Sequence, residues 1–317
     1  MSQTLLLLVI LLGSYAAIST IIGVLVGFAA RTLIGQGRRL SANGWLSLRL
    51  APVVVAAAFT LGGVWPAFAA FEPRDVEERP GAVLIALAVA AIAMLAMSAI
   101  RLTRAMRAHR QFTRRWLGDA VVLPVSGLDL PIHLVGLATP LAALVGATRP
   151  QLVMSARVVD ACSTSELRAI GAHEAAHLTA RDNLKRLLLH LCPDALRWTG
   201  SHRRLVEAWS TTSEEEADDR ACAADEAKRL VLASLLIKVA RLGSASPVQP
   251  ASSPLIGSAN LERRVRRLLD PPALPIAPLR PWRAACGASL AAAFVVAQPA
   301  TLALIHQVVE QLVGLGR

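Results

Sequence analysis

Several residue types are scarce in this sequence, and each shortage excludes a class of structure or suggests a source. The four cysteines are scattered without CxxC spacing, so we interpret them as reduced thiols and exclude a disulfide framework. Lysine occurs only at Lys185, Lys228 and Lys238, so arginine carries nearly all of the basic charge, and with the abundant alanine this favours a GC-rich bacterial source. No repeat of solenoid period is present, which excludes a repeat architecture.

What the chain has in excess is apolar sequence. Hydrophobic residues make up 54% of the 317 positions and the mean hydropathy is +0.50, which is too apolar for an ordinary soluble domain. The net charge of +11 would suggest a nucleic-acid partner in a soluble protein. In a membrane protein the same excess marks cytoplasmic loops, so we expect lipid as a partner and no direct binding of nucleic acid.

Four apolar runs are long enough to cross a hydrocarbon core of ~30 Å. No basic region precedes the first run, which argues against a cleaved signal peptide. The alternative interpretation, strongest for the last run because Pro299 interrupts it, is a buried core helix. The runs are Thr4–Ala30, Leu50–Phe71, Gly81–Ile100 and, less regularly, Ala284–Ile305.

The arginines between these runs predict their orientation. The loop Arg31–Arg49 carries arginines and no acid, whereas the connector Glu72–Arg79 is net negative, so the positive-inside rule puts the loop inside and the connector outside. Both termini are then outside a bacterial plasma membrane. We expect three regions: a three-helix transmembrane region (1–104), a cytosolic domain (105–280), and a fourth transmembrane helix with a short tail (281–317).

The cytosolic domain is predicted to be α+β, within a mainly α membrane protein of about four transmembrane helices. Short strands are expected in 120–136 and 141–155, where β-branched runs alternate with glycine and proline. Helices follow, including one at Arg203–Ser210 and another from Ser213. Ser244–Ala259 has the composition of a linker, and 260–270 forms a basic amphipathic helix whose arginine side we expect to face solvent or headgroups.

One stretch of this domain carries a metal-binding pattern, HEAAH, from His173 to His177. Ser163 and Glu166 form a capping box, so a helix should begin near Thr164, and nothing breaks it before Pro193. Two histidines four positions apart lie on one helix face, where both can bind one Zn²⁺. Glu174 beside them can take a proton from water that the metal activates.

The third ligand must come from elsewhere, because a catalytic zinc site has three protein ligands and one open position. Ser213 and Glu216 form a second capping box, which predicts a helix N-terminus with Glu214 in its first turn. Glu214 is our candidate ligand, and Asp218, one turn later, can accept the free ring N–H of a coordinating histidine. Glu215 and Glu216 compete for the ligand role, and acids at a helix N-terminus are also favoured without any metal.

The sequence does not assign a single role to the other residues near the motif. Asp182 follows His177 by five positions and should point away from the ligand face. Cys222 could face the site, although a buried structural cysteine is the simpler interpretation. Peptide hydrolysis needs an oxyanion donor, and Tyr15 lies too far away in the sequence to supply it readily. The remaining candidates are His190, His202 and Arg220.

Together, HEAAH, the following Asp182-Asn183 and the Glu214-x-x-Ala217-Asp218 pattern resemble the membrane-embedded gluzincin metallopeptidases. The run from Val145 to Leu184 is especially similar to the BlaR/MecR family. The resemblance implies one Zn²⁺ held by His173, His177 and Glu214, with Glu174 as general base. It also implies a protein substrate on the cytosolic side, in some members a BlaI/MecI-type transcriptional repressor.

Functionally, we expect a zinc-dependent endopeptidase in regulated proteolysis and signal transduction. No penicillin-binding sensor follows the last predicted span, so a β-lactam receptor is not expected. The alternatives are a heat-shock-type quality-control protease and a non-catalytic membrane scaffold, and an oligomer is compatible with any of the three. An edge strand near Pro150–Ser155 is expected to bind the substrate as an added strand.

Overall fold

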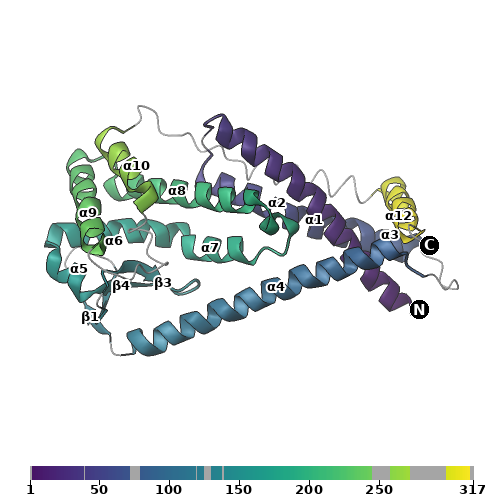
Figure 1. Cartoon of the computed structure of the whole chain (residues 1–317), viewed down its shortest axis with the longest axis horizontal. Helices are drawn as coiled ribbons and strands as arrows, with labels where there is room; N and C mark the ends of the chain where they lie inside the picture. Colours follow the sequence, from purple (N-terminus) through teal and green to yellow (C-terminus); the bar gives the residue numbers. More distant parts are fainter. Residues whose placement is uncertain are drawn as a thin grey trace. The chain divides into compact units, whose positions relative to one another are not determined.

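The chain is mostly helical, with one small sheet (Figure 1). A computed structural model describes residues 2–38, 40–71, 79–118, 120–124, 130–137, 139–244, 258–271 and 298–314. The chain divides into two compact units. The first unit comprises Met1–Leu102, Leu189–Glu207 and Pro278–Arg317, and the second comprises Thr103–Leu188 and Ala208–Ala277.

The first unit contains the apolar helices. Three helices are long and apolar enough to cross a membrane, which confirms the first three predicted runs: Gln3–Gly35, Ala42–Phe71 and Ala82–Arg115. The fourth predicted run, Ala284–Ile305, lies largely outside the described residues. The elements that lie wholly or mostly in this unit are α1 (Gln3–Gly35), α2 (Ala42–Phe59), the π-helical turn η1 (Thr60–Val64), α3 (Trp65–Phe71), α4 (Ala82–Phe112), the 3-10 turn η3 (Ala195–Trp198) and α12 (Pro299–Gly314).

Small residues let the apolar helices approach closely. At Gly13 in α1, a Cβ atom would lie 2.4 Å from Cδ1 of Leu84 in α4, so any larger residue there would require the Leu84 side chain to move. Close backbone contact of this kind is how helices gain packing energy where lipid tails remove the hydrophobic drive. The residues of α1 that are buried and small are Gly13, Ser14, Ala16, Ser19, Gly23, Gly27 and Ala30.

Polar contacts hold the segment before α8 to this helical unit. Arg49 of α2 is fully buried and its Nη1 lies 2.6 Å from Oδ2 of Asp194. The Tyr15 hydroxyl of α1 donates to the Pro193 carbonyl at 2.8 Å, and the Ser98 hydroxyl of α4 donates to the Leu191 carbonyl. Each of α1, α2 and α4 therefore contacts the stretch from Leu191 to Asp194.

The second unit contains the sheet and the predicted motif (Figure 1). The strands have the order β1-β2-β4-β3, with β2 and β4 parallel and the other pairs antiparallel. The elements that lie wholly or mostly in this unit are the π-helical turn η2 (Thr113–Leu117), β1 (Val121–Leu123), β2 (Ile132–Val135), β3 (Ala142–Val145), β4 (Gln151–Ser155), α5 (Ala156–Ala161), α6 (Thr164–Ala180), α7 (Asp182–Leu191), α8 (Gly200–Cys222), α9 (Glu226–Ser244) and α10 (Ser258–Leu269).

The expected strands are present, but the expected edge is wrong. β4 contains most of Pro150–Ser155 and lies inside the sheet, paired with β2 on one side and β3 on the other. Its alternation explains this position, because Leu152 and Met154 join the core shared with α6 and α9, while Val153 joins the core on the opposite face. A strand buried on both faces belongs in the interior of a sheet, and β3, which pairs with β4, is an edge strand instead.

Two predicted helix boundaries are also wrong. The helix that begins at Thr164 ends at Ala180, and α7 follows after one residue, rather than one helix continuing to Pro193. The two helices expected at Arg203–Ser210 and from Ser213 are one continuous helix, α8. Leu205 and Trp209 are fully buried, so packing keeps the turns before Ser213 helical despite the local capping pattern there.

Candidate metal centre

Helix α6 carries the two histidines, and its start is the one predicted. Ser163 Oγ accepts from the Glu166 amide at 3.3 Å, and Glu166 Oε2 accepts from the Ser163 amide at 2.7 Å, so both arms of the capping box form. Lys238 of α9 donates to Glu166 Oε2 at 2.8 Å. These contacts fix the first turn of the helix that carries the motif.

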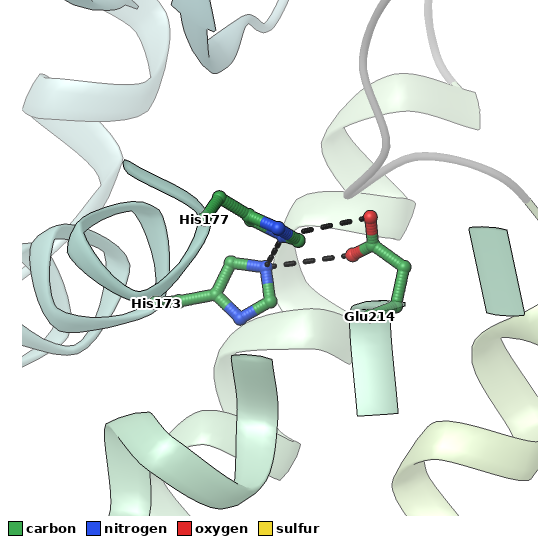
Figure 2. Close-up of side chains that lie close together, drawn as sticks. All are labelled: His173, His177 and Glu214. Carbon is green, nitrogen blue, oxygen red and sulfur yellow. Dashed lines mark hydrogen bonds and ion pairs between the residues drawn. The ribbon is translucent and has the colours of Figure 1, made fainter. Parts of the chain in front are cut away.

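His173 and His177 lie on the same buried face of α6. Their rings meet edge to face with centroids 4.7 Å apart, and their Nε2 atoms are 3.1 Å apart. Glu214 of α8 faces both rings in Figure 2, with Oε2 at 3.4 Å from Nε2 of His173 and Oε1 at 3.6 Å from Nε2 of His177. The structure therefore brings the three predicted ligands together.

The spacing of these atoms fits a zinc ion. Two atoms bound tetrahedrally at ~2.0–2.1 Å from Zn²⁺ lie about 3.3 Å apart, and the three measured separations fall close to that value. One ligand atom from each residue lies within 4.8 Å of the others, and all three residues are buried. Both Glu214 carboxylate oxygens are buried with ion-pair contacts but without a hydrogen bond among the described residues, as a metal-binding carboxylate would be.

Each histidine also has an acid on its other ring nitrogen. Oδ1 of Asp218, the partner proposed from the sequence, lies 3.0 Å from Nδ1 of His173 as an ion-pair contact. Oδ2 of Asp182 lies 2.8 Å from Nδ1 of His177 and accepts from Ser213 Oγ at 2.7 Å. Such contacts fix the tautomer that leaves Nε2 available for a metal.

The expectation that Asp182 points away was wrong because it assumed an unbroken helix. Arg181 ends α6 in the left-handed conformation, with φ 56° and ψ 39°. The chain turns at this residue, and Asp182 at the start of α7 folds back under His177. Ser213 was likewise assigned to a helix cap, but it lies within α8 and uses its hydroxyl to hold Asp182.

The acids and histidines of the cluster shift each other's pKa values toward their charged forms. Burial alone would lower the pKa of His177, but Asp182 and Glu214 outweigh it and raise that pKa to about 10. Burial alone would raise the pKa of Glu214, but its contacts with His173, His177 and Arg264 hold it well below the ordinary value. Because a metal binds the neutral imidazole, ring protons must leave when it binds.

The sequence model of peptidase family M48 matches residues 126–269 of the chain. The matched segment contains both histidines, Glu174, Glu214 and Asp218. No curated protein and no solved structure matches the chain.

The M48 match and the three apolar helices indicate a membrane-associated zinc metallopeptidase. M48 peptidases depend on zinc, and the His173–His177–Glu214 group is compatible with it. The matched family is M48, and the finer BlaR/MecR relationship suggested by the sequence stays a prediction.

Glu174, the predicted base of this M48-like site, is buried at 3% exposure. Its Oε2 accepts from the Leu144 amide of β3 at 3.1 Å. Burial raises its pKa above the ordinary value for a glutamate, which favours proton transfer closer to neutral pH. Asn183 donates to the carbonyls of Leu144 and Gly146 at 2.9 and 2.8 Å, so two side chains hold the edge strand beside the site.

The competing acids make other contacts. Glu215 lies 2.6 Å from Arg263, and Glu216 pairs with Arg220 at 2.8 Å. Neither belongs to the metal-binding group found among the described residues. Cys222 is buried in the hydrophobic core, as its simpler interpretation predicted.

The contacts of the three candidate oxyanion donors lie outside the metal-binding group. His202 accepts from Nε of Arg49 at 3.0 Å, and burial together with Arg49 and Arg197 lowers its pKa to about 4. Arg220 is exposed and bonds to Glu216, and His190 is exposed near the end of α7. Their role as oxyanion donors stays a prediction.

Arg264 of α10 contacts two acids of the site, Glu214 and Asp218, and was not among the residues predicted from the sequence. A signal was present: Leu261, Arg264, Val265 and Leu268 follow the i, i+3, i+4, i+7 spacing of one helix face. An arginine inside an apolar stripe indicates a buried partner, and Arg264 is only 3% exposed. The prediction that the arginines of this helix face solvent or headgroups is wrong for this residue.

Proposed function

We propose that this chain is a zinc endopeptidase of the bacterial plasma membrane that cleaves a protein substrate on the cytosolic side. The observation that carries the proposal is the convergence of His173, His177 and Glu214 beside the buried Glu174. Three apolar helices support the membrane location, and the arginine distribution of the loops supports the cytosolic side.

In the proposed mechanism, His173, His177 and Glu214 would hold the metal, which when bound supplies Lewis acidity toward water and the scissile carbonyl oxygen. Glu174 takes a proton from the attacking water on a carboxylate oxygen, then delivers it to the leaving amine nitrogen. Asp182 and Asp218 keep the two imidazoles in one tautomer and orientation. Burial of Glu174 keeps its carboxylate poised for both transfers.

We further propose that the substrate binds along β3 as an added strand. β3 is an edge strand next to Glu174, and backbone pairing at an edge recognises an extended peptide without requiring a particular sequence. Pairing at Leu144 would replace its present hydrogen bonds with Glu174 and Asn183. The hairpin that presents this edge turns at Gly146, whose φ of +112° favours glycine.

The biological role we propose is regulated proteolysis, with a BlaI/MecI-type repressor as the candidate substrate. This proposal is supported by the resemblance of the run Val145–Leu184 to the BlaR/MecR family and by the apolar helices that precede the domain. Membrane quality control and a non-catalytic scaffold would each give a different result in the experiment below.

Replacing Glu174 by Gln tests the enzymatic proposal. The variant should bind one zinc per chain, as the wild type should, because the ligands are unchanged, while cleavage should fall by about 10²–10⁴-fold because the base is lost. Metal analysis of the purified chain and comparison of membrane proteomes and transcripts between the two strains provide the measurements.

The outcomes separate the three roles. One stabilised repressor with altered transcripts supports regulated proteolysis, whereas accumulation of many damaged membrane proteins supports quality control. Unchanged proteomes and transcripts support a scaffold. Cleavage retained at the wild-type rate would rule out Glu174 as the base.

A further inference from the structure

Helix α10 is distant in sequence from the HEAAH motif, yet it inserts one charged side chain into the metal site. Its apolar stripe packs on the core of the second unit through Leu261, Val265 and Leu268. Arg264 belongs to the same stripe and is buried between these residues and α8. A fully buried guanidinium is costly unless it is paired and hydrogen-bonded, so its partners indicate why it is there.

The guanidinium of Arg264 contacts two carboxylates of the site at once. Nε donates to Oδ2 of Asp218 at 2.8 Å and Nη2 donates to Oδ1 at 2.7 Å, which is the bidentate arrangement that only arginine provides. Nη1 lies 3.1 Å from Oε2 of Glu214. One side chain therefore touches a metal ligand and the acid that orients another ligand.

These contacts have different consequences for the two acids. Oδ1 of Asp218 is also 3.0 Å from Nδ1 of His173, so fixing this carboxylate fixes the ring that must present Nε2. At Glu214, the contact with Arg264 is to Oε2, whereas Oε1 is the oxygen closer to His177. Holding one oxygen leaves the other free to bind as a single-oxygen ligand, which keeps a coordination position open.

The number of buried charges also favours a guanidinium at this position. Glu174, Asp182, Glu214 and Asp218 are four buried acids around two imidazoles. A divalent ion would neutralise two of these negative charges, and Arg264 neutralises a third. Without the guanidinium, Asp218 and Glu214 would repel each other one helical turn apart on α8.

We propose that Arg264 is a positioning residue of the metal centre: it orients His173 through Asp218 and limits Glu214 to one metal-binding oxygen. This inference rests on the proposed function, because it assumes that the cluster binds zinc. In this proposal α10 is part of the site. A residue of this separate helix then affects the affinity of the domain for zinc.

The neighbouring arginines of α10 provide matched controls. Arg266 pairs with Glu262 on the exposed side of the same helix, and both side chains are more than three-quarters exposed. Arg267 lies 2.6 Å from Asp219 and links α10 to α8 without contacting the metal-binding group. Replacing Arg266 tests the loss of a charge, and replacing Arg267 tests the loss of a link between the helices.

The experiment uses the full chain in detergent. Zinc affinity is measured by competition with a chromophoric chelator, and coordination is followed by the visible absorption of the Co²⁺-substituted protein. We expect Arg264→Met to weaken zinc binding by about 10–100-fold and to change the Co²⁺ spectrum. Arg264→Lys should recover part of the affinity, because a lysine keeps the charge without the bidentate geometry. Arg266→Met and Arg267→Met should match the wild type.

The results separate this inference from the proposed function. A wild-type chain that binds no zinc would overturn both. Zinc binding in the wild type, with unchanged affinity and an unchanged Co²⁺ spectrum in folded Arg264→Met or Arg264→Lys, would overturn the positioning role alone. If both variants fail to fold while Arg267→Met folds, Arg264 is a structural requirement of the helix pair, and the positioning role is again wrong.

Discussion

At the scale of single residues, each proposed metal ligand contacts a second charged side chain that is not itself a proposed ligand. Asp182 and Asp218 occupy equivalent places, each on the Nδ1 side of one histidine. Ser213 and Arg264 in turn hold these two acids. Each ligand therefore has a second contact that restricts its orientation, which lowers the entropy lost when a metal binds.

Asp182→Ala should weaken zinc binding by about 10–100-fold, because His177 would lose the partner that fixes its tautomer. Ser213→Ala removes only one of the contacts of Asp182 and should have a smaller effect. Competition with a chromophoric chelator at fixed pH measures both. Equal affinity in wild type and Asp182→Ala would show that the contact between Asp182 and His177 has no role in binding.

At the scale of secondary-structure elements, the capping box of α6 links the position of the motif to α9. Glu166 has a pKa below its ordinary value of 4.5, chiefly through its hydrogen bond from Lys238 and also through the Ser163 amide. A carboxyl whose pKa is lower in the folded state stabilises the fold above its unfolded pKa, and this stabilisation is lost as the pH falls through the folded value.

Glu166→Gln should therefore lower the thermal unfolding midpoint at neutral pH, and the difference from wild type should shrink as the pH falls below about 4.5. Circular dichroism of the two proteins across this pH range measures it. Glu262→Gln, which alters an exposed pair within α10, serves as control and should stay close to wild type throughout. A difference for Glu166→Gln that does not vary with pH would contradict the assignment.

At the scale of the whole molecule, the helical unit contains a buried ion pair between Arg49 and Asp194. Arg49 lies in a helix long and apolar enough to cross a membrane, and its partner Asp194 lies between α7 and α8. Ionisable groups in such helices are costly and persist only when they are paired. The pair therefore joins the stretch from Leu191 to Asp194 to α2, and removing one partner would leave the other charge buried and unpaired.

Arg49→Met should destabilise the protein by about 3–5 kcal/mol, because Asp194 would be left buried and unpaired. The double variant Arg49→Met with Asp194→Leu should recover much of that loss, since no charge then remains buried. Thermal unfolding in detergent measures both. If the double variant is as unstable as the single one, the pairing argument is wrong and the shape of these side chains matters instead.

The sequence by itself determined the local features of this protein. The three long apolar runs, the start of α6 and the pairing of His173 with His177 all follow from periodicity and capping within one segment. Glu214 and Asp218 lie next to the two histidines as the sequence predicted, although their expected helix start was wrong. Their i, i+4 spacing sets their common face wherever the helix begins.

Only the tertiary structure decided the partners that come from other elements. The left-handed Arg181 turns Asp182 back to His177, and packing of Leu205 and Trp209 extends α8 through Ser213. Arg264 reaches Asp218 across 46 positions of sequence. Sequence patterns describe one helix or strand at a time, whereas a hydrogen bond between distant elements depends on the packing that brings their faces together.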